Sequence, residues 1–202
     1  MSRRKLAYGV GVNDWHTNIS NGSSKHIPEY KMWLRMLERS LSEKWKVSNP
    51  TYVGVTVDPV WHSMTAFIKD VSTLVGYEQA INNGWHLDKD LLFKGNKHYS
   101  KDTCCFLPIE INSLMVMHRS SRGVYPSGVY FRKRQPKRPY CAVIRRGGIV
   151  KTLGNYSTPE EAFIAYKEAK EAYVKEVANK WKDQIDVRAY NALMNYQVEI
   201  TD

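Results

Sequence analysis

Residues 123–181 decide the fold of this chain, and they read GVYPSGVYFRKRQPKRPYCAVIRRGGIVKTLGNYSTPEEAFIAYKEAKEAYVKEVANKW. Three segments, SGVYFR, PYCAVIRR and IVKTLGNY, are rich in β-branched and aromatic residues, and turns containing Pro or Gly separate them. This pattern predicts three short strands of one antiparallel sheet. In the middle strand Ala142 and its alternate neighbours can pack on one side, while Arg145 lies on the other.

A helix is predicted to follow the third strand. Thr158 can cap it, Pro159 suits its first turn, and Glu161 stands three residues after Thr158 as in a capping box. Apolar residues then recur every three or four positions, which gives one stripe that we expect to cover the sheet. The stripe consists of Ala162, Tyr166, Ala169, Tyr173, Val177 and Trp181.

The basic residues of the chain are concentrated in the same region. The net charge is +10, from 30 basic and 20 acidic residues, yet no acidic residue lies between Ile111 and Pro159. A local positive field of this kind attracts a polyanion by counterion release. Ten basic residues lie in that stretch: Arg119, Arg122, Arg132, Lys133, Arg134, Lys137, Arg138, Arg145, Arg146 and Lys151.

The composition of the 202 residues, 43% apolar and 25% charged, predicts a globular protein with a proper core. No stretch is long and apolar enough for a membrane helix, and the first residues lack the apolar run of a secretory signal. We therefore expect a cytoplasmic protein with no membrane partner, located in the host cytoplasm if a phage encodes it. The three cysteines form no CxxC pair, so we expect them to be reduced and predict no zinc site.

The basic region resembles the ethylene-response-factor (Apetala-type, integrase-like) DNA-binding domain. The resemblance covers residues 128–170 and rests on Gly128-Val129, Arg132, Tyr140, Ala142, Ile144-Arg145, Leu153-Gly154, Tyr156, Thr158, Glu161-Ala162 and Ala165-Tyr166. It implies a sheet that lies in the major groove of double-stranded DNA. Tyr140 replaces the usual Trp of the family. The resemblance and the local charge together predict these DNA-binding residues: Arg132, Arg134, Arg138, Tyr140, Arg145, Arg146, Lys151 and Thr152.

The preceding segment, residues 30–118, has a different character. Its opening, YKMWLRMLERSL, predicts a helix whose apolar face is core; TYVGVTVDPVW predicts a strand running into a turn, and TAFIKDVSTLVGYEQAI a second helix. Next come a predicted strand (WHLDKDLL), a polar loop (FKGNKHYSKD), a second strand (TCCFL) and a helix that opens after Pro108.

This succession resembles the ββα layout of HNH-type nucleases, and the segment resembles phage and mobile-element HNH-like homing endonucleases. The motifs that carry the likeness are Tyr30 with Trp33, the run Leu87-Asp88-Lys89-Asp90, and the run Tyr99-Ser100-Lys101-Asp102-Thr103-Cys104. By that resemblance Asp88 is a metal ligand, Thr103 takes the intermediate Asn position, and Asn112, nine residues later, is a second ligand. We expect Asp88, Asp90 and Asn112 to bind Mg²⁺ or Mn²⁺, because these cations prefer oxygen ligands.

The general base of such a nuclease is a His directly after the Asp, and this chain has Lys89 there. Lys89 itself, with a strongly lowered pKa, is one candidate for the base. His86 is another, because it shares a strand face with Asp88. His98, in the polar loop, is the third.

We expect an α+β protein in four parts: an N-terminal arm and linker (1–29), an HNH-like domain (30–118), a sheet-and-helix DNA-binding domain (119–182) and a C-terminal helix (183–202). The apolar side of the last helix, formed by Ile185, Ala189, Leu193 and Tyr196, can dock on the core or pair two copies. Three functions stay open: a metal-dependent DNA endonuclease; a catalytically degenerate DNA-binding protein acting as a repressor or as an inhibitor of a host DNA enzyme; and an inhibitor that binds a host protein through its last helix.

Overall fold

The computed structural model describes residues 6–15, 27–115 and 124–200, and it has a mixed α+β fold. The chain forms two compact units, residues 1–112 with 183–189, and residues 113–182 with 190–202. Parts of the predicted arm and linker, together with Arg119 and Arg122, fall outside the described residues.

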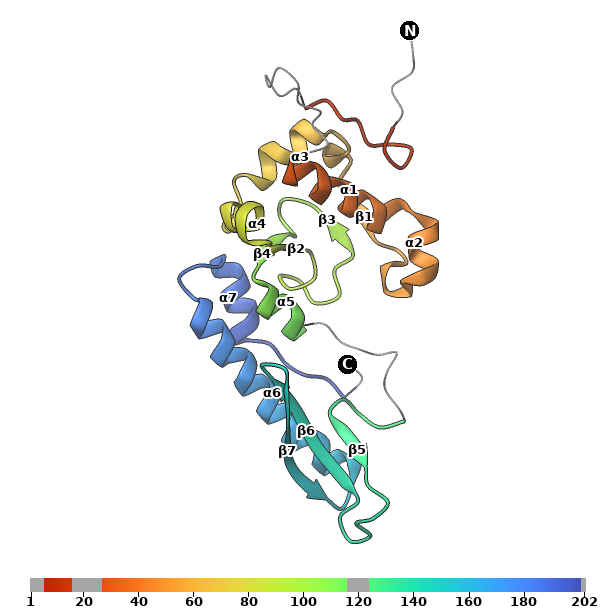
Figure 1. Ribbon diagram of the computed structural model, residues 1–202, viewed down its shortest axis with the longest axis vertical. Helices are drawn as coiled ribbons and strands as arrows, with labels where there is room; N and C mark the ends of the chain where they lie inside the picture. Colours follow the sequence, from red (N-terminus) through yellow and green to blue (C-terminus); the bar gives the residue numbers. More distant parts are fainter. Residues whose placement is uncertain (1–5, 16–26, 116–123, 201–202) are drawn as a thin grey trace. The chain divides into compact units, whose positions relative to one another are not determined.

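The first unit is built from short helices and two small sheets (Figure 1). Strands β1 and β3 pair in parallel, and strands β2 and β4 pair antiparallel. The core is aromatic: Trp33, Trp61, Phe67 and Phe106 are buried, and Trp33 Nε1 donates to the Trp61 carbonyl at 2.8 Å. The elements are α1 Pro28–Leu41, α2 Glu43–Ser48, a 3₁₀ turn Pro50–Tyr52, β1 Thr56–Val57, a 3₁₀ turn Pro59–His62, α3 Met64–Val71, α4 Tyr77–Asn83, β2 His86–Asp88, β3 His98–Tyr99, β4 Cys105–Leu107 and α5 Ile109–Met115, whose last residues pass into the second unit.

Several local predictions for this unit need correction. The single helix expected near residues 65–81 is in fact two helices. The hydroxyls of Ser72 and Thr73 donate to the carbonyls of Lys69 and Asp70 where α3 ends, and such side-chain bonds compete with the helix. The first strand of the predicted ββα segment is shorter than WHLDKDLL and ends at Asp88. The segment expected as a polar loop contains a short strand, β3, which includes His98.

The second unit contains the predicted three-stranded antiparallel sheet, in the order β5 Val129–Phe131, β6 Tyr140–Arg146, β7 Ile149–Tyr156. Strands β6 and β7 are joined by the two-residue turn Gly147-Gly148, in which both residues have positive φ (55° and 83°). Such a turn matches the twist of a hairpin and requires residues that tolerate positive φ.

Helix α6, Pro159–Trp181, packs along one side of this sheet (Figure 1). The predicted capping box is present: Glu161 N donates to Thr158 Oγ1 at 3.2 Å, and the Glu161 carboxylate accepts from Thr158 N. The buried face is broader than the predicted stripe. Its buried residues are Ala162, Phe163, Val174, Val177 and Ala178.

The C-terminal segment is a shorter helix than expected, α7 Val187–Met194, followed by an extended tail. Ile185, Ala189 and Leu193 are buried within the chain. Val198 in the tail is also buried, in a cluster with Val129, Ala142, Ala162 and Phe163. The apolar side of this segment is therefore part of the protein's own core.

Candidate functional site

The two faces of the β5–β7 sheet are distinguished by its register. Directly paired residues of antiparallel strands lie on the same face, and successive residues alternate between faces. Ala142 and Ile144 are buried on the side of α6, so Val143 and Arg145 lie on the opposite side. We call this opposite side the open face. The pairings Tyr130↔Cys141↔Asn155, Val143↔Thr152 and Arg145↔Val150 place on it Tyr130, Cys141, Val143, Arg145, Val150, Thr152 and Asn155. Arg132, which directly follows β5, continues the alternation onto this face.

Three of the predicted DNA-binding residues lie on the open face. Arg145 and Thr152 are exposed there, on the middle strand and on an edge strand. Arg132 continues the alternation of β5, and its N–H donates to the Pro139 carbonyl at 2.7 Å. Arg132 and Arg145 give this face of the sheet two positive charges.

The other predicted basic residues are distributed differently. Arg134 and Arg138 are exposed in the loop between β5 and β6. Lys151 is exposed on the edge strand β7, but it pairs with Ile144 and so alternates toward the helix side. Arg146 also lies on the helix side.

Arg146 is bound within the unit. Its guanidinium pairs with the Glu176 carboxylate of α6 and lies 4.6 Å from the centre of the Tyr173 ring. The hydroxyl of the same tyrosine accepts from Gly147 N at 3.2 Å. Arg146 therefore ties the β6–β7 turn to the helix.

Tyr140 also faces the helix side. Its ring lies 5.5 Å from both Tyr125 and Phe131, in edge-to-face contacts, and it packs on the core cluster. Such contacts between aromatic rings are stabilising, so Tyr140 contributes to the packing of the sheet on its helix side.

Sequence reasoning missed two residues of the open face. Tyr130 has 61% of its surface exposed and Val150 has 56%. The sequence held a signal for both residues. Tyr130 stands two residues before Arg132 on the same predicted strand, so the two share a face, and Val150 shares the face of Arg145 once the pairing register is known. Cys141, between Tyr130 and Asn155 across the strands, is buried.

The second candidate site lies where β2 and α5 meet in the first unit. Strand β2 pairs with β4 so that Asp88 is opposite Cys105, and α5 begins two residues after β4. The side-chain amide of Asn112 on α5 lies 3.0 Å from His86 Nδ1. His86 and Asp88 are two residues apart on one strand, hence on one face. The structure thus brings Asn112 into contact with His86, whose strand face Asp88 shares.

The Asp88 carboxylate is held by the turn that ends β2. Asp88 Oδ1 accepts from Asp90 N at 2.9 Å and from Leu91 N at 2.8 Å. Burial raises the pKa of Asp88 above its usual range, although these backbone donors oppose the increase. The protein therefore holds a carboxylate where its charge is costly.

His86 is favoured in its neutral form. Although His86 is exposed, partial desolvation of its ring lowers its pKa, the nearby guanidinium groups of Arg39 and Arg35 lower it further, and Asp88 opposes them. A neutral imidazole can accept the amide hydrogen of Asn112 at Nδ1, which leaves Asn112 Oδ1 for another partner. His86 is thus placed to orient Asn112.

Lys89, one of the three predicted base candidates, is enclosed. It has 7% of its surface exposed, its ammonium pairs with the Asp90 carboxylate, and it lies 5.5 Å and 5.6 Å from the ring centres of Tyr52 and Tyr99. A cation over aromatic rings and beside a carboxylate is stabilised as a cation. The arrangement also engages Asp90, which was predicted as a metal ligand.

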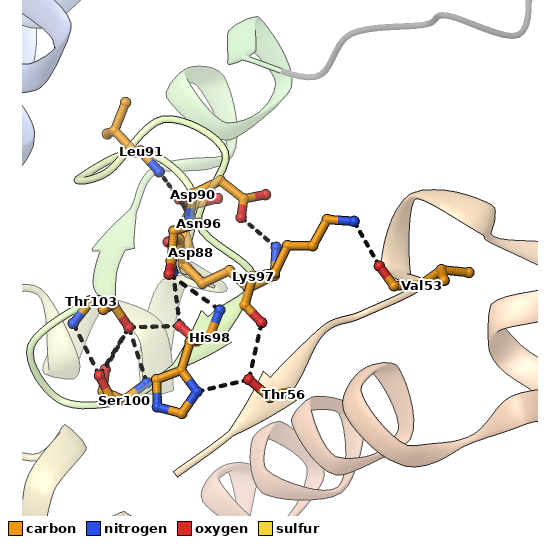
Figure 2. Close-up of polar contacts among 11 residues, drawn as sticks. Val53, Thr56, Asp88, Asp90, Leu91, Asn96, Lys97, His98, Ser100 and Thr103 are labelled. Atoms are coloured by element: carbon orange, nitrogen blue, oxygen red, sulfur yellow. Dashed lines mark hydrogen bonds and ion pairs between the residues drawn. The ribbon is translucent and has the colours of Figure 1, made fainter.

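His98 belongs to the other small sheet of the unit. Figure 2 shows its ring turned toward Thr56, and the distance from His98 Nδ1 to Thr56 Oγ1 is 2.8 Å. Its carbonyl accepts from Asn96 Nδ2 at 2.8 Å and from Thr103 Oγ1 at 2.7 Å. Thr103, in the intermediate position, therefore helps to hold the loop between β2 and β4.

The donor set suits a hard cation if Asp88 and Asn112 supply the protein ligands. Both offer oxygen, and Mg²⁺ commonly binds one or two protein oxygens and keeps water or phosphate in its other positions. Within the described residues, no three His, Cys, Asp or Glu side chains gather in a way that could hold a metal ion. A metal ion here would therefore have two protein ligands, Asp88 and Asn112.

Comparison of the chain with known protein families, with curated proteins and with solved structures gave no match. Across the described ranges, no helix has the length and apolar character required to cross a membrane.

Proposed function

We propose that the protein binds double-stranded DNA through the open face of its β5–β7 sheet. The observation that carries the proposal is the separation of charge between the two faces. Arg132 and Arg145 extend from the open face, whereas Arg146 is bound to α6. A two- or three-stranded ribbon fits the major groove, where arginine recognises guanine through O6 and N7.

The exposed basic residues at the end and at the edge of the sheet fit the DNA backbone. Arg134 and Arg138 lie in the loop at one end of the sheet, and Lys151 lies on an edge strand. Contacts of such residues with phosphates position a protein on DNA without reading its sequence. We assign base reading to Arg145 and backbone contact to Lys151.

Fluorescence anisotropy on a preferred and on a random duplex, at several salt concentrations, tests the assignment. Arg145→Ala should weaken binding to the preferred duplex by about 1–3 kcal/mol and reduce the difference between the duplexes. Lys151→Ala should weaken both duplexes alike and lower the slope of log K against log salt by about one.

Lys175→Ala is the matched control, because it removes the same charge from an exposed position on α6. It should leave the preference for one duplex intact. Equal losses for Arg145→Ala and Lys175→Ala on both duplexes would refute base reading by the open face.

The contact between His86 and Asn112 beside Asp88 favours a second function, metal-dependent hydrolysis of a phosphodiester. A bound divalent cation would neutralise the developing charge on the phosphate. Asp88 would bind the cation through a carboxylate fixed by two backbone donors, and Asn112 through the amide oxygen that His86 orients. Because Lys89 is enclosed and paired with Asp90, hydrolysis has less support than DNA binding by the sheet.

Incubation of the full-length protein with long plasmid or phage DNA and Mg²⁺ or Mn²⁺ tests cleavage. The wild type should produce breaks, and an Asp88→Ala, Asn112→Ala double variant should not. Equal background in both refutes the hydrolysis. If the same preparations still bind DNA, the function that stands is that of a non-cleaving DNA-binding protein, which acts as a repressor or blocks a host DNA enzyme.

A further inference from the structure

The open face combines exposed apolar groups with arginines. Tyr130 and Val150 have 61% and 56% of their surfaces exposed, and Val150 is directly paired with Arg145 across the strands. Each apolar side chain therefore shares its face with a guanidinium. A partner of this face must offer apolar groups and negative charge within a few ångströms of each other.

The major groove of DNA offers that combination. Its floor carries the C5-methyl group of thymine, an apolar group on a base edge, and the phosphates that border it are negative. Aliphatic and aromatic side chains contact this methyl group, whereas arginine takes the acceptors of guanine. The ten basic residues of the region, with no acidic residue among them, select a polyanion over an apolar protein surface.

We propose that Tyr130 and Val150 contact thymine methyl groups in the major groove and so determine part of the sequence preference. The inference rests on the proposed DNA binding by the open face and names the bases that its apolar residues recognise. The two residues lie on the two edge strands β5 and β7, with β6 between them. The preferred site therefore contains thymines on both sides of the base pair that Arg145 reads.

Substitution of thymine by deoxyuridine isolates the methyl group, because the two bases have the same hydrogen-bonding edge. The wild-type protein first selects a preferred duplex from a random pool, and its thymines are then replaced one at a time. At each contacted position the affinity should fall about fourfold, the value for removing one buried methyl group.

The variants Tyr130→Ala and Val150→Ala should each abolish the discrimination at one thymine position and leave it at the other. Both side chains are more than half exposed, so the fold should persist, and circular dichroism verifies this. Val124→Ala is the matched control, since Val124 is 91% exposed and lies outside the sheet. It should retain the full difference between thymine and deoxyuridine.

The possible failures are distinguishable. Binding with a clear preference but with equal affinity for thymine and deoxyuridine duplexes overturns this inference alone. A loss in Tyr130→Ala that is the same on both duplexes also overturns it, because the contact is then not with the methyl group. The absence of binding to any duplex overturns the proposed function together with the inference.

Discussion

The tail residue Val198 should contribute strongly to the stability of the second unit. It is 3% exposed and packs with Val129, Ala142 and Phe163 beneath the sheet. Two side chains of α6 hold its backbone: Val198 N donates to Glu171 Oε1 at 2.9 Å, and the Val198 carbonyl accepts from Lys167 Nζ at 2.6 Å. The tail is thus anchored by one apolar side chain and two charge-assisted hydrogen bonds.

The size of the effect follows from the groups removed. Val198→Ala deletes two buried methyl groups, about 0.8 kcal/mol each, and the cavity left behind adds to this. We therefore expect the free energy of unfolding of the unit to fall by about 2 kcal/mol. Glu171→Ala removes the acceptor of the Val198 N–H at a partly exposed position, so its cost should be smaller, about 1 kcal/mol.

Hydrogen exchange on the full-length protein measures the loss of stability in the second unit itself, because its peptides are followed separately. Peptides from β5 and β6 should exchange roughly 30-fold faster in Val198→Ala, the factor that corresponds to about 2 kcal/mol. Val124→Ala makes the same chemical change at an exposed site and should exchange like the wild type. Equal rates in the two variants would show that the tail is not anchored, and the reasoning from burial would fail.

Four further predictions concern stability and its dependence on pH, each measured by denaturant unfolding. Gly128→Ala should cost about 3 kcal/mol, because Gly128 has a φ of 74° and an added Cβ would lie 2.1 Å from Tyr166 Cδ2. Thr158→Ala should cost about 1 kcal/mol through loss of the helix cap, and Thr158→Ser should be close to wild type. The lowered pKa of His86 means that the folded state binds its proton less tightly than the unfolded state, so stability should decline as the pH falls below about 6.5, and His86→Gln should decline less. The raised pKa of Asp88 has the opposite sign: ionisation is costly at neutral pH, so Asp88→Asn should be more stable than wild type at pH 7, with the difference vanishing as the pH falls through the folded pKa.

The sheet and helix of the second unit were predictable because their signals are local. The capping box at Thr158, the glycine turn at 147–148 and the period-2 pattern of the middle strand each lie within a few residues of sequence. The structure confirms all three. The predicted stripe of the helix left out three buried residues, Phe163, Val174 and Ala178, each of which directly follows a residue of the stripe. Packing against a broad sheet buries such neighbouring positions as well as the central stripe.

Features that depend on distant partners were not predictable in this way. Arg146 and Arg145 are adjacent and chemically identical in sequence, yet Glu176, thirty residues later, binds only Arg146. Val198 likewise carries no local signal that it completes the sheet core. Sequence patterns identify which residues are apolar or basic, but tertiary contacts decide which of them face a ligand.

The segment from β2 to α5 also has contacts that sequence patterns could not predict. The likeness to HNH nucleases predicted Asp88 and Asn112 as ligands of one metal ion, and the structure places Asn112 beside His86. The sequence did not show that Asn96 and Thr103 both bind the His98 carbonyl, because that contact depends on the path of the loop. It placed His86 on the strand face of Asp88, but it did not show that His98 lies on a strand or that Lys89 is enclosed.

Lys89 illustrates why a single substitution in a motif has wider consequences. The ammonium group is held by Asp90 and lies over the rings of Tyr52 and Tyr99, so three residues contact this group. Placing a histidine at this position would remove the charge that pairs with Asp90 and leave space between the two rings. The proposed cleavage is therefore tested at His86, Asp88 and Asn112, and variants of those three residues are the ones that can separate cleavage from binding.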